Sequence, residues 1–476
     1  MVLDFDSSYR ALQARDSRFD GLFFVGVSTT GIYCRPICPA RTPKPSSCQF
    51  FPLAAAAEQA GFRPCLRCRP ELTPTNTQAE TSLAQALYRT IQEHALTGES
   101  LPSLASRTGY SSRQLRRLIT TEFGLPPIAI AQTQRLLFAR KLLQETTLPV
   151  TRIALDAGFG SLRRFNTLFR SRYGTAPGIS RGQSRATATE DLLHLRLAYR
   201  PPLAWTELLA YLQFRAIPGV EWITDDTYSR TFTFEGHPGW LSVGPMNRRD
   251  ALEVTVPAEF SPHLANILGR LRHLFDLDAN PARIDEHLRK DQRFLPTLKK
   301  FPGLRVPGAW DPFELSIRAI LGQQISVSRA TTLTGDLVKK FGSKIVTPHR
   351  ELNRLGFTAA SLASSSPEKI ATIGIPKSRA RTLHEFATDT VAGKFNFPPA
   401  TAPDKILTTL QSGFGIGPWT ANYIAMRALR LPDAFPTADL GLLKATGLTS
   451  GKKLETLSQK WRPWRAYATL HLWQSL

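Results

Sequence analysis

Five cysteines carry the most distinctive chemistry in the sequence, and all lie within the first 68 residues of a 476-residue chain. Four of them form a C-x3-C pair and a C-x2-C pair with 26 residues between the pairs: Cys34, Cys38, Cys65 and Cys68. Two close pairs separated by a loop can place four thiolates around one tetrahedral zinc ion. Buried neutral thiols and a purely structural zinc site are the alternatives. The odd cysteine count argues against a disulfide framework.

A glycine-rich segment near the C-terminus is the second candidate for chemistry. It reads LQSGFGIGPWTANYIAMRA over 410–428 and contains Gly413, Gly415 and Gly417. A dinucleotide-binding loop is the weaker interpretation, because no strand precedes the glycines. A helix–hairpin–helix is favoured, since glycines let backbone N–H groups approach a DNA phosphate without obstruction. The second helix is expected to begin near Pro418, because proline is tolerated in a first turn.

An internal repeat supplies elements that could hold such chemistry on DNA. Ala105 and Gly109 recur as Ala154 and Gly158, 49 residues later. This spacing is typical of a helix-turn-helix, in which the alanine permits close crossing and the glycine makes the turn. The pattern predicts helices over 111–123 and 161–173 with arginines on one face, namely Arg113, Arg116, Arg117, Arg163 and Arg164. An ordinary helical hairpin with a solvated basic face is the alternative.

The charge balance points to a polyanionic partner. The net charge is +22 and the pI is about 10.2. Residues 101–185 alone hold 14 basic and 3 acidic residues. We therefore expect salt-sensitive binding to nucleic acid, with a solvated basic surface as the alternative. No apolar run approaches the roughly 20 residues of a membrane span, and the acidic start lacks a signal sequence, so a cytoplasmic protein is expected.

The rest of the chain separates into a β-rich stretch and a helical stretch. Alternating and β-branched residues predict antiparallel strands over 192–199, 230–236, 240–246 and 251–257. From Pro262 to the end the pattern is helical, with glycine and proline at the breaks. Such a chain is long enough for two to four domains.

The first 182 residues resemble a known two-domain arrangement. TTGIYCRPICPARTPKP (29–45) and AGFRPCLRCRPE (60–71) resemble the zinc domain of Ada-type adaptive-response proteins, and the repeat resembles the accompanying AraC-type DNA-binding domain. The resemblance implies four cysteine ligands to one Zn²⁺, with Cys34 also accepting a methyl group irreversibly from a DNA methylphosphotriester. Loss of one thiolate charge near Arg35, Arg41 and Lys44 would then strengthen DNA binding and switch transcription. Cys48 matches no ligand.

Residues from about 190 to 476 resemble a helix–hairpin–helix DNA glycosylase of the 3-methyladenine glycosylase II (AlkA) type. DPFELSIRAILGQQISVSRA (311–330) and the hairpin carry the resemblance. It implies a catalytic carboxylate at Asp439 and a pocket for the flipped base formed by Tyr211, Trp419, Tyr423 and Trp473. Core filling by these aromatic residues is the alternative. Gln324 falls where the family inserts a wedge into DNA, and Gln323 beside it is also expected to contact DNA. Carbonyls around 411–416 would bind an alkali cation.

Three departures narrow the expected reaction. Trp419 occupies the position at which strand-cleaving relatives carry a Schiff-base lysine, so monofunctional hydrolysis is expected. No cysteine follows Cys68, which rules out a C-terminal iron–sulfur cluster. The same absence rules out an alkylguanine transferase motif.

The resemblances together predict a multidomain fold in four parts. We expect a small α/β zinc domain (1–78), an all-α double helix-turn-helix domain (79–182), an α+β antiparallel-sheet domain (190–305) and an all-α helix–hairpin–helix domain (306–476). The expected function is DNA alkylation repair coupled to transcription regulation, in a monomeric, nucleoid-associated bacterial protein that binds double-stranded and alkylated DNA and meets RNA polymerase, but no membrane. The alternatives are a glycosylase with a DNA-tethering front half and a regulator without glycosylase activity.

Overall fold

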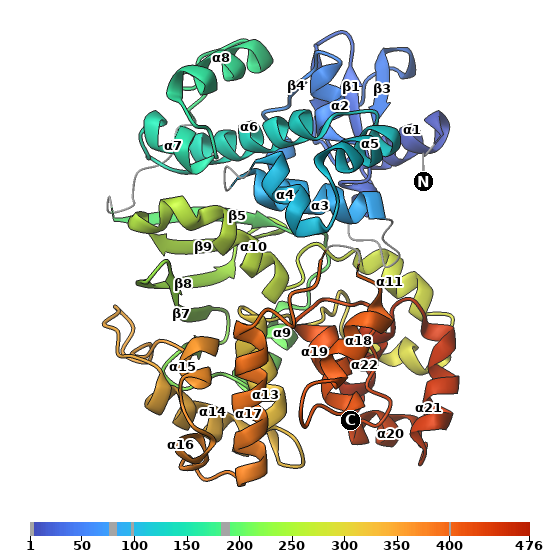
Figure 1. The fold of residues 1–476 in the computed structure, drawn as a ribbon. Helices are drawn as coiled ribbons and strands as arrows, with labels where there is room; N and C mark the ends of the chain where they lie inside the picture. Colours follow the sequence, from blue (N-terminus) through green and yellow to red (C-terminus); the bar gives the residue numbers. More distant parts are fainter. Residues whose placement is uncertain (1–3, 76–82, 97–99, 182–190, 399–400) are drawn as a thin grey trace. The chain divides into compact units, whose positions relative to one another are not determined.

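The protein is described here by a computed structural model that covers residues 4–75, 83–96, 100–181, 191–398 and 401–476, without the side chain of Arg107. The chain divides into two compact units (Figure 1). The first contains the chain up to Pro201 together with 250–269, and the second contains 202–249, 270–397 and 401–476. Predicted domain boundaries near 78 and between 182 and 190 lie outside the described residues, and the boundary at 305 stays a prediction.

The first unit begins with a small sheet of strand order β3-β1-β2-β4. Strand β1 pairs antiparallel with β2 and β3, whereas β2 and β4 are parallel. Buried aromatic residues on one face pack against alanines of the neighbouring helix α2. The elements are α1 (Phe5–Ala14), β1 (Phe24–Val27), β2 (Ile32–Cys34), β3 (Cys48–Phe51), α2 (Ala54–Gln59) and β4 (Arg63–Pro64).

The helix-turn-helix region follows, and both helices predicted over 111–123 and 161–173 are confirmed. Each begins one residue later than predicted, because Ser111 and Ser161 act as N-caps whose side chains accept backbone N–H bonds. Gly109 ends the preceding helix with φ +74°, a conformation that favours glycine. The helices are α3 (Leu83–Ala95), α4 (Leu101–Thr108), α5 (Ser112–Phe123), α6 (Pro127–Glu145), α7 (Val150–Asp156) and α8 (Leu162–Tyr173).

A buried carboxyl group joins the small sheet to these helices. Glu58 is only 3 % exposed. Its oxygens accept hydrogen bonds from Tyr33 of β2 at 3.1 Å, Thr133 of α6 at 2.9 Å and Tyr173 of α8 at 3.4 Å. Burial raises the pKa of Glu58 to about 7. The residue preceding Cys34 and the last residue of α8 therefore contact one shared group.

All four predicted strands of the β-rich stretch are confirmed. In the first unit β5 and β9 pair antiparallel along their full length, and in the second unit β6, β7 and β8 form an antiparallel meander. Strand β6 has only three residues, too few to show a period of two, and was not predicted. The strands are β5 (Leu192–Ala198), β6 (Glu221–Ile223), β7 (Tyr228–Phe234), β8 (His237–Pro245) and β9 (Ala251–Pro257); the helices are α9 (Trp205–Gln213), α10 (Leu264–Leu274), α11 (Pro281–Leu288) and α12 (Leu295–Lys300).

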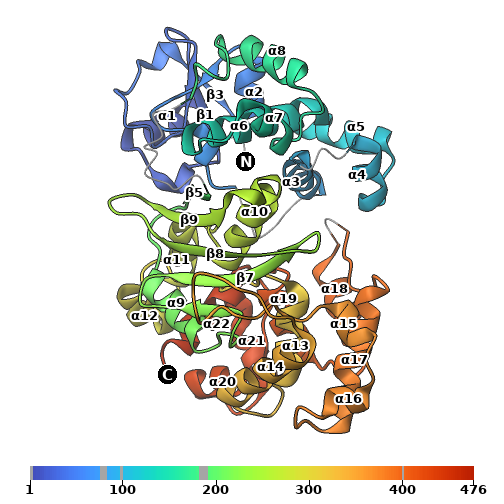
Figure 2. The same ribbon diagram turned by 90° about the vertical axis from the view of Figure 1, so that its left-hand side faces the viewer.

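The remaining helices of the second unit surround one large apolar core. In both ribbon views α15–α17 lie on one side of this unit and α20–α22 on the other, with α13 between them (Figures 1 and 2). The predicted helix at Pro418 is confirmed as α19. The helices are α13 (Pro312–Leu321), α14 (Val327–Phe341), α15 (Ala359–Ala363), α16 (Pro367–Ala371), α17 (Lys377–Val391), α18 (Pro403–Gln411), α19 (Pro418–Arg427), α20 (Leu440–Thr446), α21 (Gly451–Ser458) and α22 (Arg465–Trp473).

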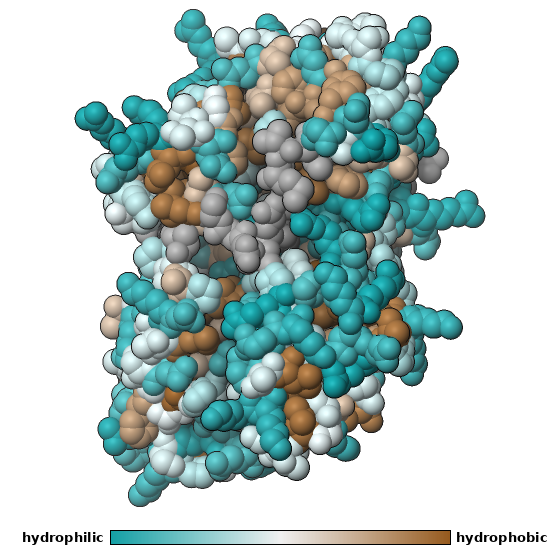
Figure 3. Space-filling model, turned by 90° about the vertical axis from the view of Figure 1, so that its right-hand side faces the viewer, coloured by the Kyte–Doolittle hydropathy of each residue, from teal (hydrophilic) through white to brown (hydrophobic). Residues whose placement is uncertain are grey.

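These elements confirm the predicted fold class of a multidomain chain with two sheet-containing and two helical parts. On the face shown in Figure 3, hydrophilic residues predominate and apolar residues lie among them in separate patches. Within the described ranges, no helix combines the length and apolar character that a bilayer crossing requires.

Candidate metal centre and candidate active site

Parallel pairing of β2 with β4 brings the two cysteine pairs together. Tyr33 is paired with Pro64, and the backbone N–H of Cys65 donates to the carbonyl of Tyr33 at 2.9 Å. Parallel strands end at the same edge of a sheet, so Cys34 and Cys65 leave that edge side by side. A turn closed by the Cys38 N–H on the Arg35 carbonyl then returns Cys38 to the same point.

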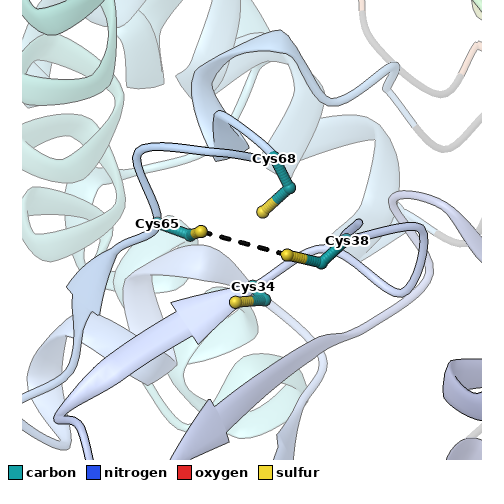
Figure 4. A group of neighbouring side chains, drawn as sticks. All are labelled: Cys34, Cys38, Cys65 and Cys68. Atoms are coloured by element: carbon teal, nitrogen blue, oxygen red, sulfur yellow. Dashed lines mark hydrogen bonds between the residues drawn. The ribbon is translucent and has the colours of Figure 1, made fainter. Parts of the chain in front are cut away.

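The four predicted ligands form one compact cluster. The Sγ atoms of Cys34, Cys38, Cys65 and Cys68 all lie within 4.8 Å of one another, and Figure 4 shows the four side chains converging. The Cys38 and Cys65 sulfurs are 3.9 Å apart, close to the roughly 3.8 Å edge of a tetrahedron with Zn–S bonds of about 2.3 Å. Backbone N–H groups of Arg35 and Arg67 donate to the sulfurs of Cys68 and Cys65, each at 3.3 Å. The geometry and the donor set fit a zinc site with four cysteine ligands.

The charge state of the four sulfurs depends on whether a metal ion is bound. Zinc, when bound, keeps such sulfurs as thiolates.

Cys34 differs from its three neighbours in accessibility. It is partly exposed, whereas Cys38, Cys65 and Cys68 are buried. It also lines a cavity of about 760 Å³ in the first unit, together with Arg41 and the final residues of the helix-turn-helix region. Lys44 is exposed nearby in the sequence. Cys38 and Cys65 line the same cavity, so partial exposure alone distinguishes Cys34 from the other three ligands.

Arg35 does not occupy the predicted position on a DNA-facing surface. Its side chain is 6 % exposed and forms an ion pair with the buried Asp20, with Nε donating to Oδ1 at 2.9 Å. Its Nη1 donates to the carbonyl of Cys68 at 3.1 Å. Arg35 thus anchors the ligand loop, and we withdraw it as a DNA phosphate contact.

The arginines predicted on the two reading helices all point to solvent. Arg113, Arg116 and Arg117 on α5 are exposed, as are Arg163 and Arg164 on α8. The opposite faces of α5 and α8 bury Leu115 and Phe165 completely. Each helix therefore has one face fixed in the core and a basic face available to phosphates.

In the second unit, Asp439 is held by three N–H donors. It is the N-cap of α20, and its Oδ1 accepts from the Leu442 N–H at 3.0 Å and from Trp473 Nε1 at 3.0 Å. Its Oδ2 accepts from Trp419 Nε1 at 2.9 Å. An ionised carboxylate only accepts hydrogen bonds. All three partners of Asp439 are donors, so they match a carboxylate and hold both of its oxygens in place.

The aromatic residues predicted to form a base pocket surround one cavity of about 420 Å³, which Asp439 also lines. The rings of Trp419 and Tyr423 are stacked at 5.2 Å with an interplanar angle of 13°. The rings of Tyr211 and Trp473 are nearly parallel at 6.4 Å and 16°. The rings of Tyr423 and Trp473, one from each pair, are tilted by 44° to one another. The structure therefore brings all five predicted residues together around one opening with aromatic walls, on which a planar base can stack.

Two arginines that line this cavity and a third that contacts one of its tyrosines were not predicted. Arg215 and Arg318 line it, and Arg427 is buried with Nη1 donating to the Tyr423 hydroxyl at 2.7 Å. Arg215 places its guanidinium 3.7 Å above the Tyr211 ring. Two of them follow a pocket tyrosine by four residues, the helical spacing that could have revealed them.

The predicted hairpin lies between α18 and α19 and is tied to the turn that follows α13. Gln323 donates from Nε2 to the carbonyl of Gly415 and to the hydroxyl of Thr420, both at 3.0 Å. Gln324 is exposed with φ +60°. Gln323 is thus used within the protein, and Gln324 remains our candidate wedge. An alkali cation at the hairpin carbonyls stays a prediction.

The three hairpin glycines have different surroundings, which yields a matched test. At Gly415, φ is +72° and a Cβ would lie 2.3 Å from the Thr382 hydroxyl, whereas a Cβ at Gly417 would meet nothing within 4 Å. We expect Gly415→Ala to lower the free energy of unfolding by about 1–3 kcal/mol and to weaken DNA binding. Gly417→Ala should leave the free energy of unfolding nearly unchanged. Thermal unfolding and duplex-binding titrations measure both, and equal stability of the two variants would contradict the proposed hairpin strain. Gly413 is buried.

Comparison with known proteins finds a relative that aligns with nearly the whole chain. A probable bifunctional transcriptional activator/DNA repair enzyme AlkA of Mycobacterium tuberculosis is 37 % identical over 484 aligned positions, which cover 99 % of this chain and 97 % of that protein. The chain belongs to this family of bifunctional activator/repair enzymes. Four family descriptions match in sequence order: the metal binding domain of Ada (7–71), a helix-turn-helix domain (104–183), the AlkA N-terminal domain (194–311) and the HhH-GPD superfamily base excision DNA repair protein (317–462).

Other known proteins are similar to only one part of this chain. DNA-3-methyladenine glycosylase 2 of Escherichia coli is 32 % identical over 58 % of this chain and 95 % of its own length. The E. coli transcriptional activator/DNA repair enzyme Ada is 36 % identical over 32 % of this chain and 42 % of its own length. A 3-methyladenine DNA glycosylase from Archaeoglobus fulgidus shares the fold, with a TM-score of 0.51 at 19 % identity over 59 % of this chain and 97 % of that structure. Both resemblances predicted from the sequence are confirmed.

Proposed function

We propose that the second unit is a monofunctional DNA glycosylase that hydrolyses the glycosidic bond of alkylated purines, including 3-methyladenine and 7-methylguanine. One observation carries the proposal: a carboxylate fixed by three N–H donors lines an aromatic cavity of about 420 Å³. The volume of this cavity falls within the range typical of small-molecule binding sites. Similarity to the glycosylases named above supports the same reaction.

The proposed step uses the intrinsic weakness of the substrate. Alkylation at N3 or N7 makes the purine cationic, so its glycosidic bond breaks with both electrons moving to the base. The Asp439 carboxylate stabilises the positive charge that develops on the sugar. Water then bonds to C1′ and loses a proton, for which Asp439 is the acceptor. Trp419 carries no amine, so no Schiff base forms and the DNA strand stays intact.

Access to the base requires that the nucleotide leave the duplex. Gln323 fixes the turn carrying Gln324 against the hairpin. Arg379 ties the same turn to α17, because its Nη2 donates to the Gln323 carbonyl at 2.6 Å. We propose that Gln324 enters the gap left by the flipped nucleotide. Its amide can replace hydrogen bonds that the opposite base loses.

For the first unit we propose irreversible methyl transfer from a DNA methylphosphotriester to Cys34. The Cys34 sulfur forms a bond to the methyl carbon while the methyl carbon–oxygen bond breaks. The electron pair remains on oxygen, which restores a phosphodiester anion. A zinc ion with four thiolate ligands has a net charge of −2, which becomes −1 when one thiolate becomes a thioether. Less negative charge beside Arg41 and Lys44 then strengthens binding to DNA phosphates.

The helix-turn-helix arginines are proposed to read the DNA on which this switch acts. Replacing Arg113, Arg116 and Arg117 together by Gln should weaken duplex binding and reduce the slope of log affinity against log salt by about 0.9 per lost phosphate contact. Arg18→Gln is the control, because Arg18 is already paired with Asp16. An unchanged slope in the triple variant would contradict phosphate contacts by α5. RNA polymerase contact, a monomeric state and a nucleoid location belong to this same proposal.

The direct test of the glycosylase incubates the zinc-loaded protein with methylated duplex DNA and separates the released bases by chromatography. We expect 3-methyladenine and 7-methylguanine to appear as free bases and the strand to remain uncut. Release of no base by a folded protein would favour a regulator without glycosylase activity. Strand cleavage at the abasic site would contradict the monofunctional mechanism.

A further inference from the structure

Arg200 belongs to the region that matches the AlkA N-terminal domain, yet its side chain contacts the zinc domain. It is 2 % exposed, and its Nε and Nη2 donate to the carbonyl of Asp20 at 2.9 and 2.7 Å. It also donates to two further backbone carbonyls, each at 3.2 Å, those of Pro74 and Thr75. The carboxylate of Asp20 is paired with Arg35, which directly follows Cys34. Asp20 and Arg35 therefore connect this buried guanidinium to a predicted metal ligand.

A second buried path leads from another ligand through helix α6. Arg69 directly follows Cys68 and donates from Nη2 to Oε1 of Glu145 at 2.8 Å. Lys141, one turn earlier in α6, is paired with Glu145 at 2.6 Å. The side chains of Lys141 and Glu145 are 7 % and 6 % exposed, so water and salt screen these charges little.

The same two α6 side chains cover one edge of strand β5. The strand pairs with β9, but the backbone N–H of Arg196 donates to Glu145 Oε2 at 3.0 Å instead, and the Arg196 carbonyl accepts from Lys141 Nζ. The backbone groups of a strand edge need such partners when they are buried. Strand β5 therefore takes two of its backbone hydrogen bonds from side chains that also belong to the path from Cys68.

We propose that Arg200 and Glu145 are positioning residues that join β5 to the four-cysteine site, so that each holds the other in place. A bound metal ion fixes the two ligand loops, and the arginines that follow the ligands then hold Asp20 and Glu145 where β5 needs them. Buried charges tolerate the loss or displacement of a partner poorly, so movement of a ligand loop changes the stability of β5. Coupling between two sites is reciprocal, so an ordered β5 tightens metal binding. This inference depends on neither of the two reactions proposed above.

Hydrogen exchange of the full chain, followed by mass spectrometry, tests the effect of the metal on β5. Peptides covering 192–198 should exchange about tenfold faster after a chelator removes the zinc, within the usual range of coupling between two sites. Peptides from β7 and α13 in the second unit are the internal control and should keep their protection. Unchanged exchange of β5 in the metal-free chain would overturn the proposal. An equal increase in all three segments would show global unfolding and would also overturn it.

Zinc affinity, measured by competition with a coloured chelator, tests the reverse effect. Arg200→Gln should lower the affinity by about tenfold, the lower end of the range for residues that support metal ligands. Arg200→Lys keeps a positive charge and N–H donors, so it should recover most of the loss. Glu145→Gln should also lower the affinity, because Arg69 loses its charged partner. Arg18→Gln is the control, since Arg18 forms an exposed pair with Asp16 in the same domain, and it should bind zinc as wild type does.

Two glycine substitutions test the Arg200 contact without changing any charge. A Cβ at Gly21, the residue after Asp20, would lie 2.4 Å from the Pro74 carbonyl oxygen and 3.0 Å from Arg200 Nη2. Gly21→Ala should therefore lower zinc affinity and speed exchange of β5. Gly61→Ala is the matched control, because φ is +89° at Gly61 and +80° at Gly21, but a Cβ at Gly61 meets nothing within 4 Å. It should keep the wild-type zinc affinity.

The outcomes separate a positioning role from general destabilisation. Wild-type zinc affinity in folded Arg200→Gln and Gly21→Ala would overturn the role of Arg200. Equal loss of affinity in Gly21→Ala and Gly61→Ala would assign the effect to backbone strain and overturn it as well. If Arg200→Gln does not fold, the exchange measurement on wild type decides the question without a variant. Failure of base release or of methyl acceptance leaves every one of these measurements unaffected.

Discussion

Asp439→Asn is expected to lower the rate of 7-methylguanine release by about 10²–10³-fold, the effect typical of removing a preorganised charge-stabilising group. The substitution keeps the shape and can keep the N-cap, because the amide oxygen still accepts from Leu442 and Trp473. It removes the negative charge and turns an NH2 group toward the N–H of Trp419, so that two donors face each other. In the wild type this Trp419 N–H donates to Oδ2 of Asp439 at 2.9 Å. Single-turnover release from methylated duplex DNA measures the effect on chemistry apart from product release.

Two controls separate catalysis from folding and binding. Asp404→Asn removes an exposed carboxylate in the first turn of α18 and should release base at the wild-type rate. Affinity of Asp439→Asn for methylated duplex should stay near the wild-type value, since the hairpin and the aromatic walls are unchanged. If Asp439→Asn released base at the wild-type rate, Asp439 would have no part in the mechanism.

The fold followed from local signals wherever those signals were strong. Ser111 and Ser161 precede amphipathic runs and end up as N-caps, and Pro418 opens α19 as its missing N–H allows. Strand β4 has two residues, Arg63 and Pro64, and no periodicity can reveal a strand that short. Yet β4 sets the position of Cys65, so spacing alone predicted the ligand set but not how the chain assembles it.

The site residues show where sequence reasoning stops. Arg35 stands beside Cys34 in the sequence and was assigned to DNA, but burial against Asp20 gives it a different task. The sign of a charge is visible in a sequence, whereas its exposure depends on contacts with distant residues. Arg427 shows the reverse case, because its importance comes from one contact with Tyr423 and from two carbonyls more than 100 residues away.

Cys34→Ala is expected to abolish methyl acceptance completely. Intact mass of the zinc-loaded protein after incubation with methylphosphotriester-containing DNA should show one added methyl group in wild type, and peptide mapping should place it on Cys34. No methyl should be added to Cys34→Ala. Cys48→Ala is the matched control and should accept one methyl, because Cys48 lies in β3 outside the cluster and its thiol donates to the Lys44 carbonyl at 3.4 Å.

Comparison with a buried ligand separates acceptance from zinc binding. Cys38→Ala also removes one of four ligands, and structural zinc sites contribute about 10–16 kcal/mol to folding in small peptides, so both variants should lose zinc affinity and stability. Cys38 and Cys65 also line the cavity, but Cys34 is the one ligand of the four that is partly exposed, so methylation of wild type should occur there alone. A methyl group on Cys38, Cys65 or Cys68 would refute the accessibility argument. No methyl on zinc-loaded wild type would reduce the cluster to a structural site, and the chain would then be a glycosylase with a DNA-tethering first unit.

If Cys34 is the acceptor, methylated wild type must also bind duplex DNA more tightly than the unmethylated protein, because the zinc centre has lost one negative charge beside Arg41.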